Sequence, residues 1–305
     1  MLKRTLLLVV LAFAVPYLAN DKPLLVSPSG NVVFRAPIPY GENQFFEGAL
    51  PLPPSANHWL GTDDRGRDLL VRILYGFKNT FLLSLGVTLA TLAIALLVGL
   101  LSVSLPAPFN KVILLTMETL GSLPYFFIIL AVLSKFNGIE SLVILSLLCA
   151  WIPTSFLVRG EALRVLSQNY ILSARVLGAS WMRLGIVHIL PNLFSPIRSS
   201  FPLVLSGFFY LLAYLHYLGI LSFEPHSSLG ELLTEGRGNL QSPALIFAPL
   251  FATLLPIFLL FPKKGSGDEI KNLQRVLLKN SSHFENLEKF CRQKNRFARF
   301  KKLPE

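Results

Sequence analysis

Two ionisable side chains lie in otherwise apolar stretches of this sequence. Glu118 lies in METLGSLPYFF, six residues before Pro124, and His216 lies in AYLHYLGIL. Because a charge inside a membrane is costly, such a side chain normally faces a partner group or a path for a polar cargo. We therefore take Glu118, Pro124 and His216 as candidates for such a path. The alternatives are a hydrogen bond from Glu118 to a neighbouring helix, and a His216 that reaches the outer interface beside Tyr214 and Tyr217.

The motifs of the chain do not indicate a catalytic site of its own. The sequence holds no phosphate-binding Gly-x-x-x-x-Gly-Lys-Ser/Thr, so we expect any ATP to be hydrolysed by another chain. It also lacks His-Glu-x-x-His, Cys-x-x-Cys and Gly-x-Ser-x-Gly, and Cys149 and Cys291 suggest no disulfide framework. We predict no catalytic residue, no metal ligand and no cofactor bound by this chain.

A further candidate is the segment YILSARVLGASWMRLGIVHILPN, residues 170–192, which lies between two apolar stretches. Its basic side chains are Arg175, Arg183 and His188. Gly178 permits a sharp turn between two helical pieces, and we expect Leu190-Pro191 to end the second piece.

The same segment has the side chains that a docking surface needs. Ala174 and Ala179 are small enough for a partner to approach closely. Apolar side chains that could enter such a partner are Leu177, Met182, Ile186 and Ile189. The alternative is an inert amphipathic connector, held at the lipid headgroups by its arginines.

Composition indicates which elements position these residues. The chain has 305 residues, of which 52% are hydrophobic and 15% charged, and this is too apolar for a water-soluble domain. Apolar runs of the roughly 17 to 25 residues that a span requires lie at 80–104, 111–133, 139–158, 195–218 and 243–262, with a sixth candidate at Leu6–Ala19. We predict an all-α membrane protein with six transmembrane helices.

The first of these runs has two interpretations. Lys3 and Arg4 precede a short apolar stretch, as they do in a secretory signal peptide. Pro16, Tyr17 and the lack of a clean small-x-small cleavage site favour a retained membrane anchor.

The orientation follows from the distribution of Lys and Arg. The segment after Phe261 holds twelve of the 28 Lys and Arg residues against five acidic ones. We therefore predict that both termini are cytoplasmic and that residues 170–192 lie in a cytoplasmic loop. The basic tail, 263–305, is expected to bind anionic membrane lipid rather than nucleic acid, because phenylalanines recur along it.

The segment 20–78 is predicted to lie outside. Seven prolines between Pro23 and Pro54 indicate an extended strap that leans on another element. The following HWLGTDDRGRDLLVRILYGFKNT predicts an amphipathic helix at the outer interface, capped near Asp63, with Asp68, Arg72 and Arg65 away from its apolar face. The alternative is a plain solvated helix that leads into the next span.

At these residues the sequence resembles a known family. HWLGTDDRGRDLLVRILYG and SARVLGASWMRLGIVHILPN resemble segments of the second permease subunit of bacterial dipeptide and oligopeptide ATP-binding-cassette importers. ANDKPLLV, at 19–26, and SSLGELLTEGRGNLQSP, at 227–243, are similar to the branch that imports microcin C and related oligopeptides. The resemblance implies the type I importer permease fold and a location in the bacterial inner membrane.

The resemblance also implies partners and a role for the cytoplasmic loop. The partners would be a related permease in a heterodimer, two cytoplasmic ATPases that bind ATP and Mg, and an extracytoplasmic substrate-binding protein. The loop, 160–192, would couple to the ATPases through the positions that match the family motif: Leu172, Ser173, Ala174, Arg175, Gly178, Ala179, Arg183, Leu190 and Pro191. Leu172 stands where the family motif has glutamate, so the acidic contact to the ATPase cannot be made by this chain.

We accordingly expect residues 1–19 to form the first span, 20–78 the outer strap and amphipathic helix, 79–262 the permease core, and 263–305 the cytoplasmic tail. The predicted function is the permease of an ATP-driven peptide importer, with a nickel-chelate importer of the same family as an alternative. A rival from another class, an intramembrane hydrolase, needs a nucleophile and a base close together. Glu118 and His216, predicted near opposite sides of the membrane, do not supply them.

Overall fold

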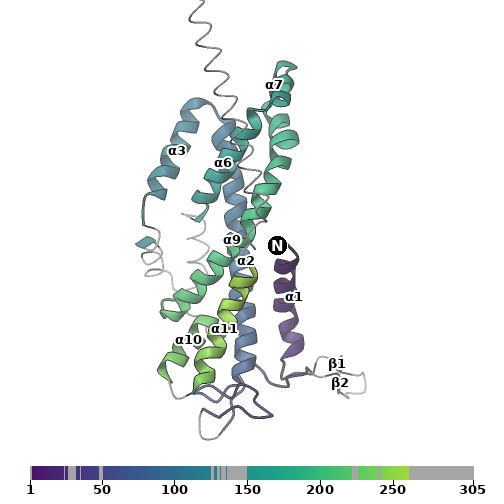
Figure 1. Cartoon of the computed structure of the whole chain (residues 1–305), viewed down its shortest axis with the longest axis vertical. Coiled ribbons are helices and arrows are strands. Elements are labelled where there is room, and N and C mark those ends of the chain that lie inside the picture. Colours follow the sequence, from purple (N-terminus) through teal and green to yellow (C-terminus); the bar gives the residue numbers. More distant parts are fainter. Residues whose placement is uncertain are drawn as a thin grey trace, which may run out of the picture. The chain divides into compact units, whose positions relative to one another are not determined.

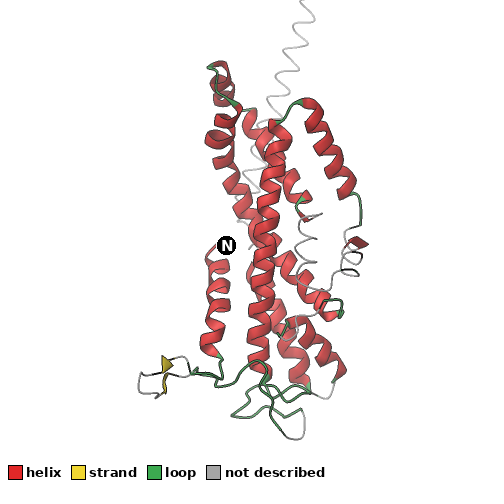
Figure 2. Ribbon diagram, turned by 180° about the vertical axis from the view of Figure 1, so that it is seen from behind, coloured by secondary structure: helices red, strands yellow, loops and turns green. Residues whose placement is uncertain are grey.

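The computed structural model describes residues 2–23, 25–26, 32–34, 36–47, 51–124, 127–128, 131, 135, 150–221, 226–239 and 242–260. The described residues all lie in the first of two units of the chain, Met1–Phe261, and the predicted lipid-binding tail, 263–305, lies outside the described residues. The first unit is mostly helical (Figures 1 and 2). Its helices are α1 (Leu2–Leu18), α2 (Leu69–Ser104), α3 (Ala107–Gly121), α6 (Ile152–Leu166), α7 (Asn169–Val176), α8 (Trp181–Arg183), the π-helix η2 (Leu184–Ile189), α9 (Leu190–Tyr217), α10 (Leu229–Gly238) and α11 (Pro243–Leu260).

Three stretches of helix are long and apolar enough to cross a membrane. Among the described residues they are Leu69–Ser104, Trp181–Tyr217 and Pro243–Leu260. The 17 residues of α1 carry one of the other predicted spans. Of the predicted span 111–133, positions 111–124, 127, 128 and 131 are described, and the predicted span 139–158 is described only from residue 150, so six spans remain a prediction.

Helix α2 is the central element and packs against α1, α6, α9 and α11. It begins where the carboxylate of Asp68 accepts a hydrogen bond from the Val71 N–H at 3.0 Å, and it runs without interruption to Ser104. The predicted cap at Asp63 is therefore wrong by one turn. Arg72 is fully buried rather than turned toward solvent, because it has buried ionic partners, and a separate amphipathic helix before the span is not confirmed.

Apolar side chains from distant parts of the sequence meet around α2. The rings of Phe77, Phe81 and Phe209 pack together with centroids 5.4 to 6.4 Å apart and join Leu8 of α1 in one buried cluster. A second cluster joins α6 to the segment 171–193 through Val158, Ala162, Leu184 and Ile189, among others. These clusters fix the position of α9 along α2 and α6.

The described part of the strap contacts the start of α2. Strands β1 (Leu25–Val26) and β2 (Val32–Phe34) pair antiparallel, and the Phe46 N–H donates to the Gly66 carbonyl oxygen at 2.8 Å. The imidazole of His58 stacks on Tyr40, and its Nδ1 lies 2.8 Å from a carboxylate oxygen of Asp68. The strap is thereby tied to the residue that caps α2.

Candidate functional site

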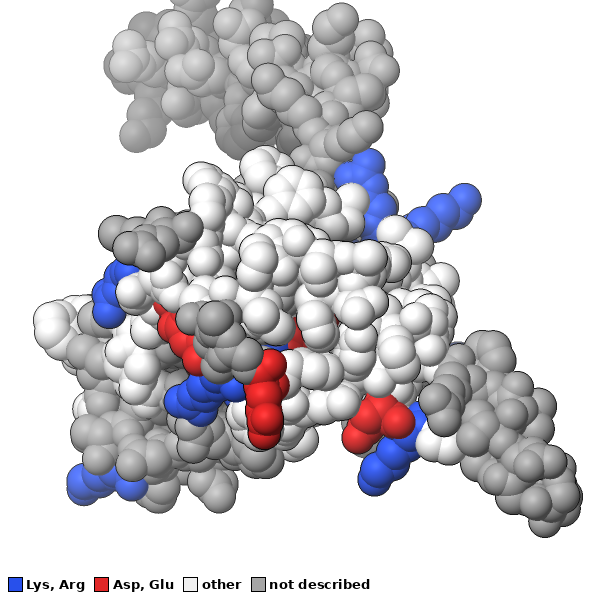
Figure 3. All heavy atoms as spheres, turned by 90° about the horizontal axis from the view of Figure 1, so that it is seen from below, with Lys and Arg blue, Asp and Glu red and all other residues white. Residues whose placement is uncertain are grey.

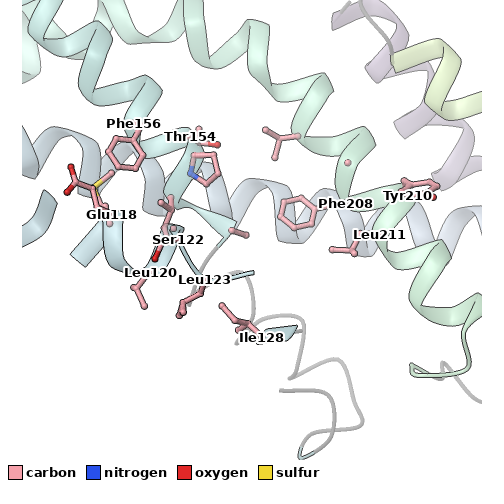
Figure 4. A pocket seen from close by; sticks show the side chains of 17 residues that line it. Glu118, Leu120, Ser122, Leu123, Ile128, Thr154, Phe156, Phe208, Tyr210 and Leu211 are labelled. Carbon is pink, nitrogen blue, oxygen red and sulfur yellow. The ribbon is translucent and has the colours of Figure 1, made fainter. Parts of the chain in front are cut away.

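A cavity of about 970 Å³ lies between α3, α6 and α9. Its wall is mostly apolar, and among the described lining residues Glu118 carries the only charge. Figure 4 shows Glu118 beside Phe156 at one end of the row of labelled side chains, and Tyr210 and Leu211 at the other end. The labelled lining residues are Glu118, Leu120, Ser122, Leu123, Ile128, Thr154, Phe156, Phe208, Tyr210 and Leu211.

The three candidates for a transport path lie in different environments. Glu118 lies in the last turn of α3 with an exposed side chain that faces the cavity. Pro124 follows α3, and its carbonyl oxygen accepts a hydrogen bond from the Phe127 N–H at 3.0 Å. His216 is 3% exposed, and its Nδ1 lies 2.7 Å from the Leu212 carbonyl oxygen. Only Glu118 of the three lines this cavity, and the alternative in which His216 reaches the interface is wrong because its ring is enclosed by neighbouring helices.

The segment between α6 and α9, residues 167–189, is called the connecting loop below. Helix α7 ends in a turn at Gly178, which has a φ of 85°. The Gly178 N–H donates to the Arg175 carbonyl oxygen at 2.9 Å, and the Ala179 N–H donates to the Ala174 carbonyl oxygen at 3.0 Å. This pair of bonds is the Schellman motif, which favours glycine at the left-handed position. Ser180 then caps α8 by accepting from the Arg183 N–H.

The second helical piece does not end at Pro191. Helix α8 continues through η2 into α9, so that residues 181–217 form one helical path. The expectation that Pro191 terminates a helix is therefore wrong. A proline removes one backbone donor and its ring crowds the preceding turn, and Pro191 lies in the first turn of α9, directly after the wider π-helical turn.

The connecting loop has a buried face and an exposed face. Ile171, Leu184 and Ile189 are at most 1% exposed and pack against α6, and Ala174 and Ala179 pack partly against the same cluster. The expectation that Ile189 is a docking side chain is thus wrong. The exposed face carries large apolar side chains: Val176 (88% exposed), Leu177 (86%), Met182 (75%), Ile186 (60%) and Val187 (55%).

The basic side chains of this loop lie near its exposed face. The Arg175 guanidinium stacks on the Trp181 ring at 4.5 Å from its centroid, which holds both side chains in place, and Arg183 is exposed. Leu172 lies within α7. Residues 167–192 contain no acidic residue, so the exposed face is apolar and cationic.

A group of buried ions, called the ion cluster below, lies at the start of α2. The Asp63 carboxylate accepts hydrogen bonds from Arg67 at 2.8 Å and from Arg72 at 2.5 Å, and Arg67 and Arg72 also pair with Glu235 of α10. Glu231 lies 3.6 Å from Arg72. Figure 3 shows this end of the molecule, where acidic and basic side chains lie side by side.

Sequence reasoning missed the ion cluster and most of the cavity wall. Asp63 and Glu235 are separated by 172 positions, and no local spacing connects them. Phe156 and Phe208 looked like ordinary apolar residues of two spans. The signal that could have been used for the cluster is that three arginines and three acids occur within residues 63–72, in a chain that is otherwise poor in charge.

The helical architecture and the apolar spans define an integral membrane protein with a large cavity among its helices. Comparison with known proteins agrees. The family model described as "Binding-protein-dependent transport system inner membrane component" matches residues 91–261, and the chain belongs to this family.

Several curated relatives are similar to this chain. The inner membrane ABC transporter permease protein YejE of Escherichia coli is 33% identical over 234 residues, which cover 75% of this chain and 69% of that protein. The peptidoglycan transport system permease protein YejE of Agrobacterium fabrum is 30% identical over 67% of this chain and 54% of its own length. The oligopeptide transport system permease protein OppC of Bacillus subtilis is 29% identical over 65% of this chain and 63% of its own length. The chain thus spans about half to two thirds of the length of these relatives.

Proposed function

We propose that this chain is the permease subunit of an ATP-driven peptide uptake system, in which it forms one half of the translocation path. The observation that carries this proposal is the continuous helical path from Trp181 to Tyr217. One end bears the exposed apolar side chains Met182 and Ile186, and farther along the same path Phe208 and Leu211 form part of the cavity wall.

This arrangement is suited to coupling. The path contains 37 residues, so at 1.5 Å per residue it extends for about 55 Å. A helix of that length, packed on α2 and α6, transmits a push on its loop end to the cavity wall, because packed helices move as bodies rather than deform continuously. A partner that closes on the connecting loop would therefore reshape the cavity.

The proposed partners complete such a system. They are a related permease that supplies the other half of the path, two cytoplasmic ATPases that bind ATP and Mg, and an extracytoplasmic binding protein that delivers the cargo. ATP hydrolysis is assigned to the partner chains because this sequence has no phosphate-binding motif. The connecting loop and both termini are accordingly proposed to lie in the cytoplasm.

The proposed cargo is a peptide or a peptide-containing molecule, with microcin C-like compounds as a narrower possibility. Two relatives are named for oligopeptide and peptidoglycan transport, and peptidoglycan itself contains peptides. A cavity of about 970 Å³ with one carboxylate is compatible with an apolar or cationic peptide. In this proposal Glu118 contacts the cationic group of the cargo.

The proposal is tested by reconstituting the full chain with its partner permease, both ATPases and a loaded binding protein. We expect ATP hydrolysis to rise when the loaded binding protein is added. The double variant Leu177→Asp, Met182→Asp should lower this stimulated rate at least about ten-fold, since two charges would be buried unpaired against the ATPase. The control Gln168→Asp places a charge on an exposed polar position of the same loop and should leave the rate unchanged.

Two results would contradict the proposal. One is an undiminished stimulated rate in the double variant, which would show that the exposed face is not the coupling surface. The other is cleavage of a peptide by the purified chain alone and without ATP, which would favour an intramembrane hydrolase.

A further inference from the structure

A second recess, of about 420 Å³, lies between α9, α10 and α11. It differs from the cavity of Glu118 because a cation lies at one end of an apolar slot. Its apolar wall includes Leu233, Ile246, Leu250, Leu254 and Ile257, and its aromatic side is formed by Tyr210, Tyr214 and Tyr217. This recess is called the tyrosine groove.

The cation lies at one rim of the tyrosine groove. The Arg237 guanidinium lies over the Tyr217 ring at 5.6 Å from its centroid, at the end of α9. A Cβ on the neighbouring Gly236 would lie 2.3 Å from the Leu245 carbonyl oxygen, so the last turn of α10 lies against the first turn of α11. Arg237 and Tyr217 therefore mark the same end of the groove.

The groove extends from this rim for about the depth of one lipid leaflet. From Ile246 to Ile257 the helix α11 advances eleven residues, or about 16 Å, and half of a hydrocarbon core of ~30 Å is about 15 Å. The exposed tyrosines 210 and 214 follow α9 beside it. A straight acyl chain would fit along this slot with its headgroup at Arg237.

The charge of Arg237 is not neutralised by the acids of its own helix. Glu231 and Glu235 point toward Arg72 in the ion cluster, and Arg237, two residues after Glu235, lies about 200° around the helix from it. Among the described residues, no ion pair of Arg237 is present. The rim therefore presents a guanidinium and a phenol, which are donors suited to a phosphate.

We propose that the tyrosine groove binds an anionic phospholipid, with the headgroup phosphate at Arg237 and one acyl chain along Leu250 and Leu254. The inference depends on the chain being a membrane protein and not on the proposed peptide cargo.

The test uses the full chain in phosphatidylcholine vesicles that contain a trace of photoactivatable lipid. Two probes share one diazirine acyl chain and differ in headgroup, phosphatidylglycerol or phosphatidylcholine, and mass spectrometry maps the adducts. The phosphatidylglycerol probe should label peptides of α11 about five-fold more than the phosphatidylcholine probe, as expected for one cation near an anionic lipid. Leu254→Trp, which fills the slot, should lower labelling by both probes.

Two arginine variants separate this site from general surface charge. Arg237→Gln should remove the five-fold preference, whereas Arg198→Gln, a matched change at an exposed position of α9 outside the groove, should retain it. Unfolding temperatures are measured for all variants so that lost labelling is distinguished from lost folding. Equal labelling of the unmodified chain by both probes, or a preference that persists in Arg237→Gln, would overturn the proposal.

A further arm examines the assembled transporter. If the adducts on α11 disappear when the partner permease is present, and Leu250→Cys crosslinks to that permease, the groove is a protein interface and the proposal is wrong. Persistence of the adducts in the assembled complex supports a lipid site.

Discussion

The ion cluster and the connecting loop differ in which side chains they bury: the ion cluster buries charged side chains, whereas the connecting loop exposes large apolar ones. In the ion cluster, Asp63 and Arg72 are at most 1% exposed and pair with each other, and Arg72 also pairs with Glu235 of α10. In the connecting loop, Arg183 is exposed and large apolar side chains such as Leu177 face outward. Figure 1 shows α10 and α7 at opposite ends of the bundle formed by the first unit.

This difference indicates that the two regions have different tasks. A buried charge that loses its partner is severely destabilising, so such a cluster holds its elements in one arrangement. An exposed apolar face contributes little to the stability of the chain by itself and is typical of a surface that another protein covers. The ion cluster thus fixes α10 on α2. The apolar side chains on the exposed face of the connecting loop have the character of a surface that another protein covers.

The largest expected effect comes from removing the shared acid of the ion cluster. Asp63→Ala leaves two buried guanidinium groups short of a partner, and we expect a loss of about 3–5 kcal/mol in the free energy of unfolding. Denaturant titration in detergent measures it. Arg65→Ala, at an exposed position two residues away, should change stability by less than about 0.5 kcal/mol, and equal effects of the two variants would show that the cluster is not structural.

The next effect concerns the close approach of α10 to α9. A Cβ at Gly230 would lie 2.0 Å from the Ala213 carbonyl oxygen, so Gly230→Ala should force the helices apart and destabilise by about 1–3 kcal/mol. Gly207→Ala on α9 meets no atom within 4 Å and should be neutral or stabilise by up to about 1 kcal/mol. The unfolding temperature should therefore fall in Gly230→Ala but not in Gly207→Ala, and a stable Gly230→Ala would contradict the observed packing.

A smaller effect is expected in the connecting loop. Gly178→Ala meets no neighbouring atom, but it places a Cβ at a φ of 85°, which costs about 1–2 kcal/mol. Because only the turn is strained, we expect a clear fall in the rate of coupled ATP hydrolysis together with a small loss in the free energy of unfolding. Gly185→Ala, in the same loop at an ordinary backbone conformation with open space around it, should leave both unchanged. A loss of ATPase coupling in both variants would contradict a specific role of the turn.

The smallest effect concerns the ion pair at the end of α6. Arg164 donates hydrogen bonds to both carboxylate oxygens of Glu161, at 2.9 and 2.5 Å, and these bonds hold the pKa of Glu161 below its ordinary value of 4.5. Since the pKa is lower in the folded chain, the pair stabilises above pH 4.5 and its contribution is lost as the pH falls through the folded value. Glu161→Gln should cost only a few tenths of a kcal/mol at pH 7, because the pair is partly exposed. Unfolding curves of both proteins should converge at low pH or in high salt, and a difference that grows there would contradict this assignment.

Local sequence patterns predicted several features that the structure has. Apolar runs predicted helices at 80–104, 195–218 and 243–262, and α2, α9 and α11 cover most of these ranges. Gly178 indicated a turn between two helical pieces, and the structure has one there. Glu118, suspected because it is an acid in an apolar run, faces a cavity. These features depend on residues within one or two turns of each other.

The sequence by itself determined that the chain is a membrane protein, where its long helices lie and that a turn at Gly178 divides the segment 170–192, since hydrophobicity and backbone preference act locally. Only the tertiary structure decided that Arg72 is buried against Glu235, that Ile189 faces inward while Ile186 faces outward, and that the helix continues past Pro191. The first two outcomes depend on partners far away in the sequence, and the third on the π-helical turn directly before Pro191. A buried charge requires its counterion, and a helix face becomes a core only when another helix covers it.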